Sequence, residues 1–230
     1  MIFFTRFAII LTLVQFLFFS NTEYARAEQE CTGKVCFSWA FGAIVGSGGK
    51  GKLIEITRDT ELKSGDQLKM LIRLKQECFV YVFYYSAQGK FYMLFPYSLD
   101  QFSTDYILSK KYYIPQGKFV FELDDNVGYE KFYLIASVRR LSELENLYGS
   151  YGSAETYKRP DFLKNIIDEI KQLRKQQRKL TSEAERPLTN LGPIRAHIVD
   201  GETEFARLDK IATEYNAKDF FAKTITINHK

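Results

Sequence analysis

The sequence predicts a mainly β fold: an antiparallel β-sandwich of about seven or eight strands, with an inserted amphipathic helix near its C-terminal end. Three observations predict it. Tyrosine and phenylalanine, which favour half-buried strands, are abundant, with 15 Tyr and 20 Phe among 230 residues. Short apolar segments recur between turns marked by glycine, proline or aspartate. One long segment, 161–180, instead repeats its apolar residues at steps of three and four, as a helix does.

Residues 78–95 carry the clearest strand signal. Residues 79–85 are aromatic or β-branched, residues 86–90 have the composition of a turn, and residues 91–95 continue as a second strand. That order predicts a β-hairpin. Pro96 ends it, because proline has no N–H to donate to a strand ladder.

Further strands are expected on both sides of this hairpin, at residues 37–44, 53–57, 67–74, 118–123 and 130–138. A glycine-rich loop, 46–51, follows the first of them. In the turn Ser64-Gly65-Asp66, glycine supplies a positive φ, and aspartate accepts hydrogen bonds from backbone amides.

The final strand sets the expected domain organisation. Residues 219–227 end in alternating threonine and isoleucine, which predicts a strand that rejoins the sheet. We therefore expect a single β-rich domain over 28–230, with a core at 37–147 and an insertion of helix and loop at 149–218. Residues 149–153, rich in glycine and serine, are expected to be a loop.

The helix expected at 161–180 presents two alternatives. Its apolar stripe consists of Leu163, Ile166, Ile170, Leu173 and Leu180. One flank of the stripe is basic, with Lys171, Arg174, Lys175, Arg178 and Lys179. Such a helix either docks on a sheet face with a solvated basic edge or rests on an anionic membrane surface. We favour docking, because soluble domains commonly cover a sheet in this way.

The N-terminus has the three parts of a cleavable signal peptide, residues 1–27. Arg6 supplies the positive charge, an apolar run follows over residues 7–19, and Ala25-Arg26-Ala27 is a small-x-small cleavage site. An uncleaved membrane anchor is the alternative. However, a helix of that length rises only about 20 Å, whereas a hydrocarbon core is about 30 Å thick. We expect cleavage after Ala27 and a periplasmic or secreted protein.

Charge and residue counts exclude several classes of function. The formal net charge is only +4, from 32 Lys+Arg against 28 Asp+Glu, so no nucleic-acid partner is expected. His197 and His229 have no ligand partner at short spacing, and we expect neither a metal nor a cofactor. A cysteine hydrolase would pair Cys78 with one of these histidines. It is not expected, because Cys78 lies within an apolar strand, where a buried thiol is expected.

The other two cysteines, Cys31 and Cys36, lie five positions apart directly after the signal. An exported protein reaches a compartment that permits disulfides. We therefore expect a Cys31–Cys36 bridge.

An ordered series of short motifs resembles a known family. The series runs from Leu62-Lys63-Ser64-Gly65-Asp66 through Val80-Tyr81-Val82-Phe83, Gly89 and Leu94-Phe95-Pro96 to Tyr113-Ile114-Pro115, Phe121-Glu122-Leu123-Asp124, Gly128-Tyr129-Glu130 and Leu134-Ile135-Ala136-Ser137. It resembles a bacterial envelope family catalogued as a domain of unknown function, DUF 4384, over residues 37–147. The resemblance implies an extracytoplasmic domain in bacteria. It implies no enzymatic activity and no established ligand.

The function expected from these observations is non-enzymatic: an exported interaction module acting with a cell-envelope protein or with a polymer such as a glycan. Tyrosine offers a large apolar area with a hydrogen-bonding tip, which suits interfaces. An exposed aromatic face is expected from Tyr84, Tyr92, Tyr97, Tyr112 and Tyr113. The alternative is an envelope hydrolase whose carboxylate site lies near Asp66 and the segment from Asp124 to Glu130.

Overall fold

The computed structural model describes residues 34–46, 51–180 and 207–230, without the side chains of 177–180. The expected signal peptide (1–27), Cys31, His197 and residues 181–206 of the expected insertion lie outside the described residues.

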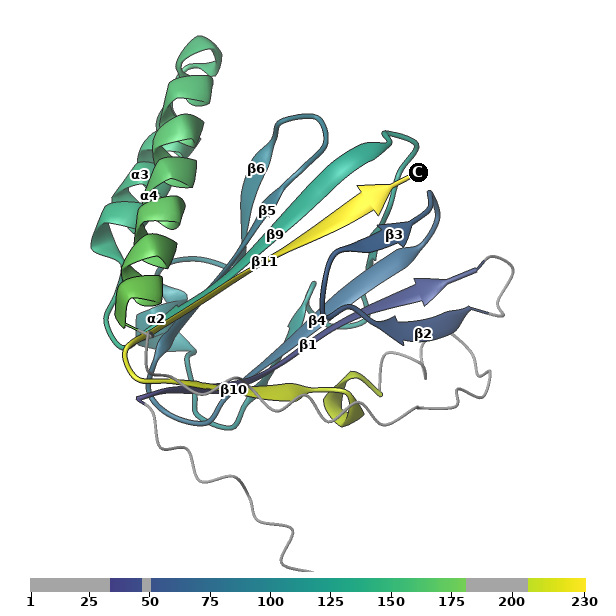
Figure 1. Ribbon diagram of the computed structural model, residues 1–230, viewed down its shortest axis with the longest axis horizontal. Coiled ribbons are helices and arrows are strands. Elements are labelled where there is room, and N and C mark those ends of the chain that lie inside the picture. Colours follow the sequence, from purple (N-terminus) through teal and green to yellow (C-terminus); the bar gives the residue numbers. More distant parts are fainter. Residues whose placement is uncertain (1–33, 47–50, 181–206) are drawn as a thin grey trace, which may run out of the picture. The chain divides into compact units, whose positions relative to one another are not determined.

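Two β-sheets pack face to face (Figure 1). The six-stranded sheet has the order β10-β1-β4-β7, and β2 and β8 pair with β1 and β4. Its strands are β1 (Val35–Val45), β2 (Lys52–Glu55), β4 (Gln67–Leu74), β7 (Lys111–Ile114), β8 (Phe121–Glu122) and β10 (Thr213–Ala217). This architecture confirms the mainly β sandwich that the sequence predicts.

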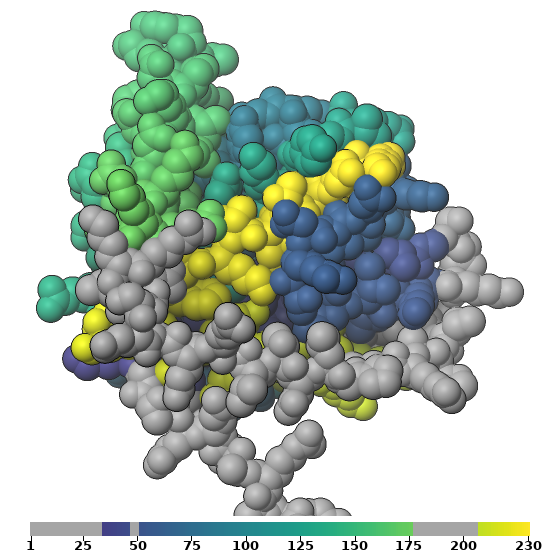
Figure 2. All heavy atoms as spheres, in the orientation of Figure 1, coloured from purple at the N-terminus to yellow at the C-terminus, as the bar shows by residue number. Residues whose placement is uncertain are grey.

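The five-stranded sheet has the order β3-β11-β9-β5-β6. Its strands are β3 (Thr60–Leu62), β5 (Phe79–Tyr85), β6 (Phe91–Phe95), β9 (Gly128–Ser137) and β11 (Phe220–His229). Figure 2 shows β11, in yellow, with blue residues of the β3 region on one side and teal residues of β9 on the other. The hairpin β5–β6 is the one expected from residues 78–95, and Gly89 in its turn has a positive φ of 78°.

The main core lies between the sheets. Phe41 of β1 meets Phe132 of β9 with ring centroids 4.8 Å apart, and Trp39 and Phe41 are in edge contact. Strand β1 is buried along almost its whole length, because its other face is covered too. There Ala40 and Ile44 pack against Leu208, which belongs to the short 3-10 helix η2 (Leu208–Lys210).

Two helices cover the outer face of the five-stranded sheet (Figure 1). They are α3 (Ser142–Ser153) and α4 (Arg159–Leu180), joined through η1 (Thr156–Lys158); a short α2 (Gln101–Thr104) lies earlier in the chain. Leu144 of α3 and Ile166 and Ile170 of α4 are buried against the sheet. Helix α4 is therefore docked on the sheet, which is the favoured alternative.

The basic flank of α4 is partly used within the fold. Lys171 pairs with Asp168 at 2.9 Å, and Arg174 donates to the Thr224 hydroxyl at 3.0 Å. The side chains of Arg178 and Lys179 lie outside the described residues. Within the part of the chain that the structure describes, no helix has both the length and the apolar character needed to cross a bilayer.

Several elements differ from the expectation. Strands β3 and β7 are not among the expected strands, and of the strand expected at 118–123 only Phe121–Glu122 forms. Residues 149–153, expected as a loop, are the end of α3, because packing on the sheet outweighs the low helix propensity of Gly149 and Gly152. Thr213–Ala217, within the expected insertion, is β10 and pairs with β1. The pair β3–β11 is parallel in an otherwise antiparallel set of described pairs.

Candidate functional site

Four segments meet where β11 ends. They are the turn before β4, the β5–β6 turn, the turn between β8 and β9, and the last residues of β11. At this end, between the β5–β6 hairpin and the segment from β8 to β9, lies a cavity of about 200 Å³, which we call the end pocket. It is lined by Tyr84, Ser86, Gln88, Lys90, Tyr92, Glu122, Leu123, Asp124, Asn126 and Glu130.

Glu130 is the buried carboxylate of the end pocket, with 4% of its surface exposed. It precedes the inner-face residues Phe132 and Leu134 by two and four positions along β9, so its side chain points between the sheets as theirs do. Its Oε2 accepts the Ala87 N–H at 3.1 Å, and the Tyr84 hydroxyl also bonds to this carboxylate. These bonds fix the orientation of the carboxylate inside the fold.

Two tyrosines form an aromatic wall of the pocket. Tyr84 and Tyr92 are register partners in the hairpin, and their rings stack at 6.0 Å with 17° between the planes. Tyr84 also stacks on Phe132 at 5.0 Å, whereas Tyr92 is 44% exposed. Burial raises the pKa of the Tyr84 hydroxyl, and the hydrogen bond to Glu130 and the negative charges of Glu130 and Asp124 raise it further. The phenol therefore stays protonated and uncharged.

Asp124 and Asp66 have different roles at this end. Asp124 is exposed and accepts the Asn126 N–H at 2.9 Å and the Asn126 side-chain amide at 2.7 Å, which lowers the pKa of its carboxyl. Asp66 is buried and accepts the Lys63 N–H at 2.8 Å and the Gly46 N–H at 3.2 Å. Asp66 thus caps its turn, next to Gly65 with its positive φ of 86°.

A serine and a histidine lie beside Glu130. The Ser64 hydroxyl is 3.1 Å from His229 Nε2, and His229 Nδ1 is 4.0 Å from Glu130 Oε1. His229 is 2% exposed, and its Nδ1 has no hydrogen-bond partner in the described structure. The order of groups is that of a nucleophile, a base and an orienting carboxylate.

Serine chemistry also needs backbone N–H groups that can stabilise an oxyanion. Here the Gly65 N–H donates to Leu123 O at 2.7 Å, and the Asp66 N–H donates to Lys63 O at 3.0 Å. The Ser64 N–H itself donates to Lys230 O at 3.4 Å. The donors of this turn are therefore engaged inside the fold.

The five tyrosines expected to form one exposed face do not do so, which corrects that expectation. Tyr112 is only 2% exposed and lies in the core between the sheets. Tyr113 packs on the outer face of the six-stranded sheet with Leu208. Tyr97 is half-buried and donates to Tyr113 O at 2.7 Å. Only Tyr84 and Tyr92 share a site.

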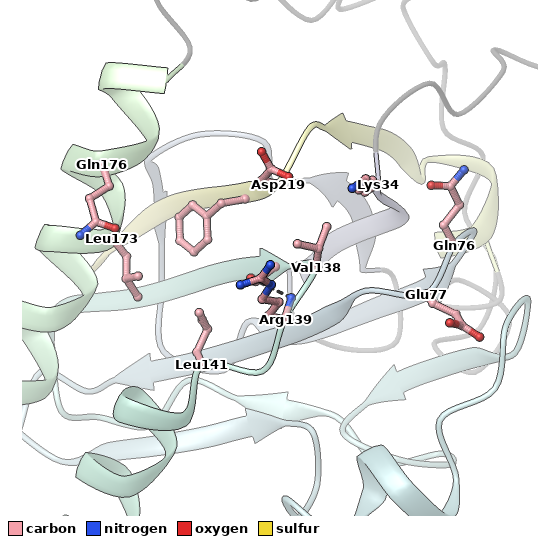
Figure 3. A pocket seen from close by; sticks show the side chains of 11 residues that line it. Lys34, Gln76, Glu77, Val138, Arg139, Leu141, Leu173, Gln176 and Asp219 are labelled. Atoms are coloured by element: carbon pink, nitrogen blue, oxygen red, sulfur yellow. Dashed lines mark hydrogen bonds between the residues drawn. The ribbon is translucent and has the colours of Figure 1, made fainter.

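A larger cavity of about 860 Å³ lies at the other end of β9 (Figure 3). Val138, Leu141, Leu173 and Phe220 give it an apolar lining. Its charged side chains are Lys34, Glu77, Arg139 and Asp219, and all four are exposed. Because its charges are of both signs and none is buried, it defines no ligand chemistry, and the end pocket is the candidate site.

The Cys78 thiol is buried, as the sequence predicts, and burial raises its pKa from the ordinary 9.0 to about 11. A raised pKa contributes stability that is complete below pH 9 and is lost as the pH rises toward 11. We expect Cys78→Ala to flatten the decline in the free energy of unfolding between these pH values, measured by urea denaturation. Parallel declines in both proteins would contradict the assignment. The Cys31–Cys36 bridge stays a prediction, because Cys31 lies outside the described residues.

Comparison with known proteins gives one result. No curated protein and no solved structure matches the chain. One family model matches, and its span holds Ser64, Asp66, Asp124 and Glu130 of the site but not His229. The resemblance inferred from the sequence motifs is confirmed: residues 61–140 match the family described as Domain of unknown function (DUF4384).

Proposed function

We propose that this chain is a non-enzymatic, exported interaction module that acts with a cell-envelope protein or polymer in bacteria. The observation that carries the proposal is the end pocket, where the stacked pair Tyr84 and Tyr92 faces converging polar groups. A concave site with an aromatic wall and a few oriented polar side chains is what ligand recognition requires. Export rests on the signal-peptide pattern of residues 1–27, with cleavage after Ala27.

Removal of the exposed tyrosine tests this proposal. We expect the purified protein to bind isolated cell envelopes in a sedimentation assay and Tyr92→Ala to weaken binding about tenfold, as loss of a pocket aromatic does. The matched control is Tyr157→Ala, because Tyr157 is 73% exposed and lies in η1, away from the pocket. Equal binding by the two variants would contradict a role for the end pocket.

An envelope hydrolase is the second candidate, and the contact between Ser64 and His229 beside Glu130 favours it. The structure also brings Asp66 and Asp124 to the same end of the sandwich. Turnover of ester or glycoside substrates that is lost in Ser64→Ala or Glu130→Gln would establish this candidate. It would overturn the non-enzymatic proposal.

A further inference from the structure

We propose that the end pocket binds the cationic end of an arginine or lysine side chain from a protein partner. The inference rests on the proposed function and narrows it to one ligand chemistry. It is carried by three features of the pocket, namely its charge, its aromatic wall and its size.

The charge of the end pocket is negative. Glu122, Asp124 and Glu130 line it, against the single cation Lys90. Burying a carboxylate such as Glu130 is costly unless a positive group pairs with it. Among the described residues, His229 is the one basic side chain within 4.0 Å of Glu130, and it is charged only when protonated. A cation from a partner would complete the pairing of a carboxylate that the fold already holds in place.

The aromatic wall favours the same chemistry. The face of a tyrosine ring attracts cations through its quadrupole. Tyr92 is 44% exposed and lines the pocket beside the carboxylates, whereas the ring of Tyr84 is stacked between Tyr92 and Phe132 and supports that wall from behind. The pKa of Tyr84 supports the sign of the local potential, because the Glu130 and Asp124 charges both raise it. Hydrogen bonds from Asn126 lower the pKa of Asp124, which favours the charged form of this carboxyl. A cation would thus meet both an aromatic face and carboxylate acceptors.

The size of the pocket restricts the ligand to one small group. Its volume is about 200 Å³. Pockets for drug-sized ligands have roughly 300–1,000 Å³. The end pocket therefore accommodates the end of a single side chain, with the rest of the partner lying on the surrounding turns. A guanidinium or ammonium group has the charge and the donors that the lining accepts.

The experiment compares two peptides that differ only in charge. The probes are acetyl-Gly-Gly-Arg-Gly-Gly-amide and the same peptide with neutral citrulline in place of arginine, titrated into the protein and followed by NMR. We expect shifts at the end pocket with the arginine peptide alone, weakened by added salt. Glu130→Gln and the exposed Asp124→Asn are each expected to reduce the affinity by about tenfold, as loss of a charged acceptor does. The control Glu143→Gln removes an exposed carboxylate on α3 and is expected to leave binding unchanged.

The contrary outcomes separate this inference from the proposed function. Equal binding of the arginine and citrulline peptides would overturn the cation site. So would wild-type affinity for the arginine peptide in both the Asp124→Asn variant and a correctly folded Glu130→Gln variant. Binding of a neutral N-acetylglucosamine trimer that Tyr92→Ala abolishes, without binding of the arginine peptide, would also overturn it. That last result would leave the proposed interaction module standing with a glycan as its ligand. Absence of any binding, both to the probes and to envelopes, would remove both proposals.

Discussion

Replacing Phe41 with alanine is expected to lower the free energy of unfolding by about 3–5 kcal/mol. Phe41 is 1% exposed, and its ring lies 4.8 Å from Phe132 on the opposite sheet and 6.0 Å from Trp39. The substitution removes apolar area from the core and leaves a cavity between two sheets that cannot close it without shifting. Because domains are stable by only about 5–15 kcal/mol, such a loss is a large part of the total.

Urea denaturation measures this effect, with the fluorescence of the single tryptophan as the probe of core packing. Phe119→Ala is the matched control, since Phe119 is 77% exposed, and a change within about 0.5 kcal/mol is expected there. If both substitutions lowered the free energy of unfolding by the same amount, Phe41 would not lie in the core described above.

Local signals in the sequence predict the parts of the fold that local chemistry determines. The hairpin β5–β6 follows from two β-rich segments around a short turn with glycine, and the turn before β4 follows from Gly65 and Asp66. The stripe of α4 likewise predicts a docked helix, because an apolar face with Ile166 and Ile170 needs a surface to cover. In each case, the residues that carry the signal lie close together in the sequence.

Elements that depend on distant partners could not be predicted in this way. Helix α3 contains Gly149 and Gly152, and its local propensity argues for a loop. Strand β10 is short and mostly polar, and it forms because β1 offers an edge to pair with. The parallel pairing of β3 with β11 joins residues far apart in the chain.

The candidate site shows the same division. The stacking of Tyr84 on Tyr92 could be predicted from the hairpin register, because residues opposite each other share a face. Conversely, Tyr112 and Tyr113 are consecutive in β7 and therefore point to opposite sides, so they could not belong to one face. The alternation of side chains along a strand is therefore the signal that excludes a single face made of all five tyrosines.

The contact between Ser64 and His229 had no such signal. The two residues are 165 positions apart, and neither lies in a sequence motif that would indicate the other as its partner. They meet because β3 and β11 pair in parallel, which places the turn after β3 next to the end of β11. A site assembled by long-range pairing of this kind becomes visible only in the folded chain.

Replacing Glu145 with alanine is expected to lower the free energy of unfolding by about 2–4 kcal/mol, because it breaks a buried hydrogen-bond network. The Tyr81 hydroxyl donates to Glu145 Oε1 at 2.6 Å and accepts the Leu141 N–H at 3.1 Å. Arg140 donates to both carboxylate oxygens, from Nε at 3.0 Å and from Nη2 at 2.5 Å. Tyr81 is fully buried, so the substitution leaves its hydroxyl without an acceptor and Arg140 without its carboxylate partner.

A double-mutant cycle with Tyr81→Phe separates the network from simple loss of helix contacts. The two substitutions share one hydrogen bond, and a coupling of about 1–2 kcal/mol is expected. Glu143→Ala on the exposed face of the same helix is the control, with an expected loss below about 1 kcal/mol. Purely additive effects of Glu145→Ala and Tyr81→Phe would show that the bond between them contributes nothing.

Besides its contribution to the free energy of unfolding, the network positions α3 over the edge strand β6. From α3, the hydroxyls of Tyr148 and Tyr151 accept the Met93 N–H at 3.0 Å and the Phe91 N–H at 3.3 Å. These are outward-facing groups of an edge strand, which would otherwise be open to pairing with another chain. Glu145→Ala should therefore also cause association that increases with protein concentration, detected by light scattering below the unfolding transition. A variant that is destabilised yet stays monomeric at every concentration would show that the tyrosine caps hold the edge without the network.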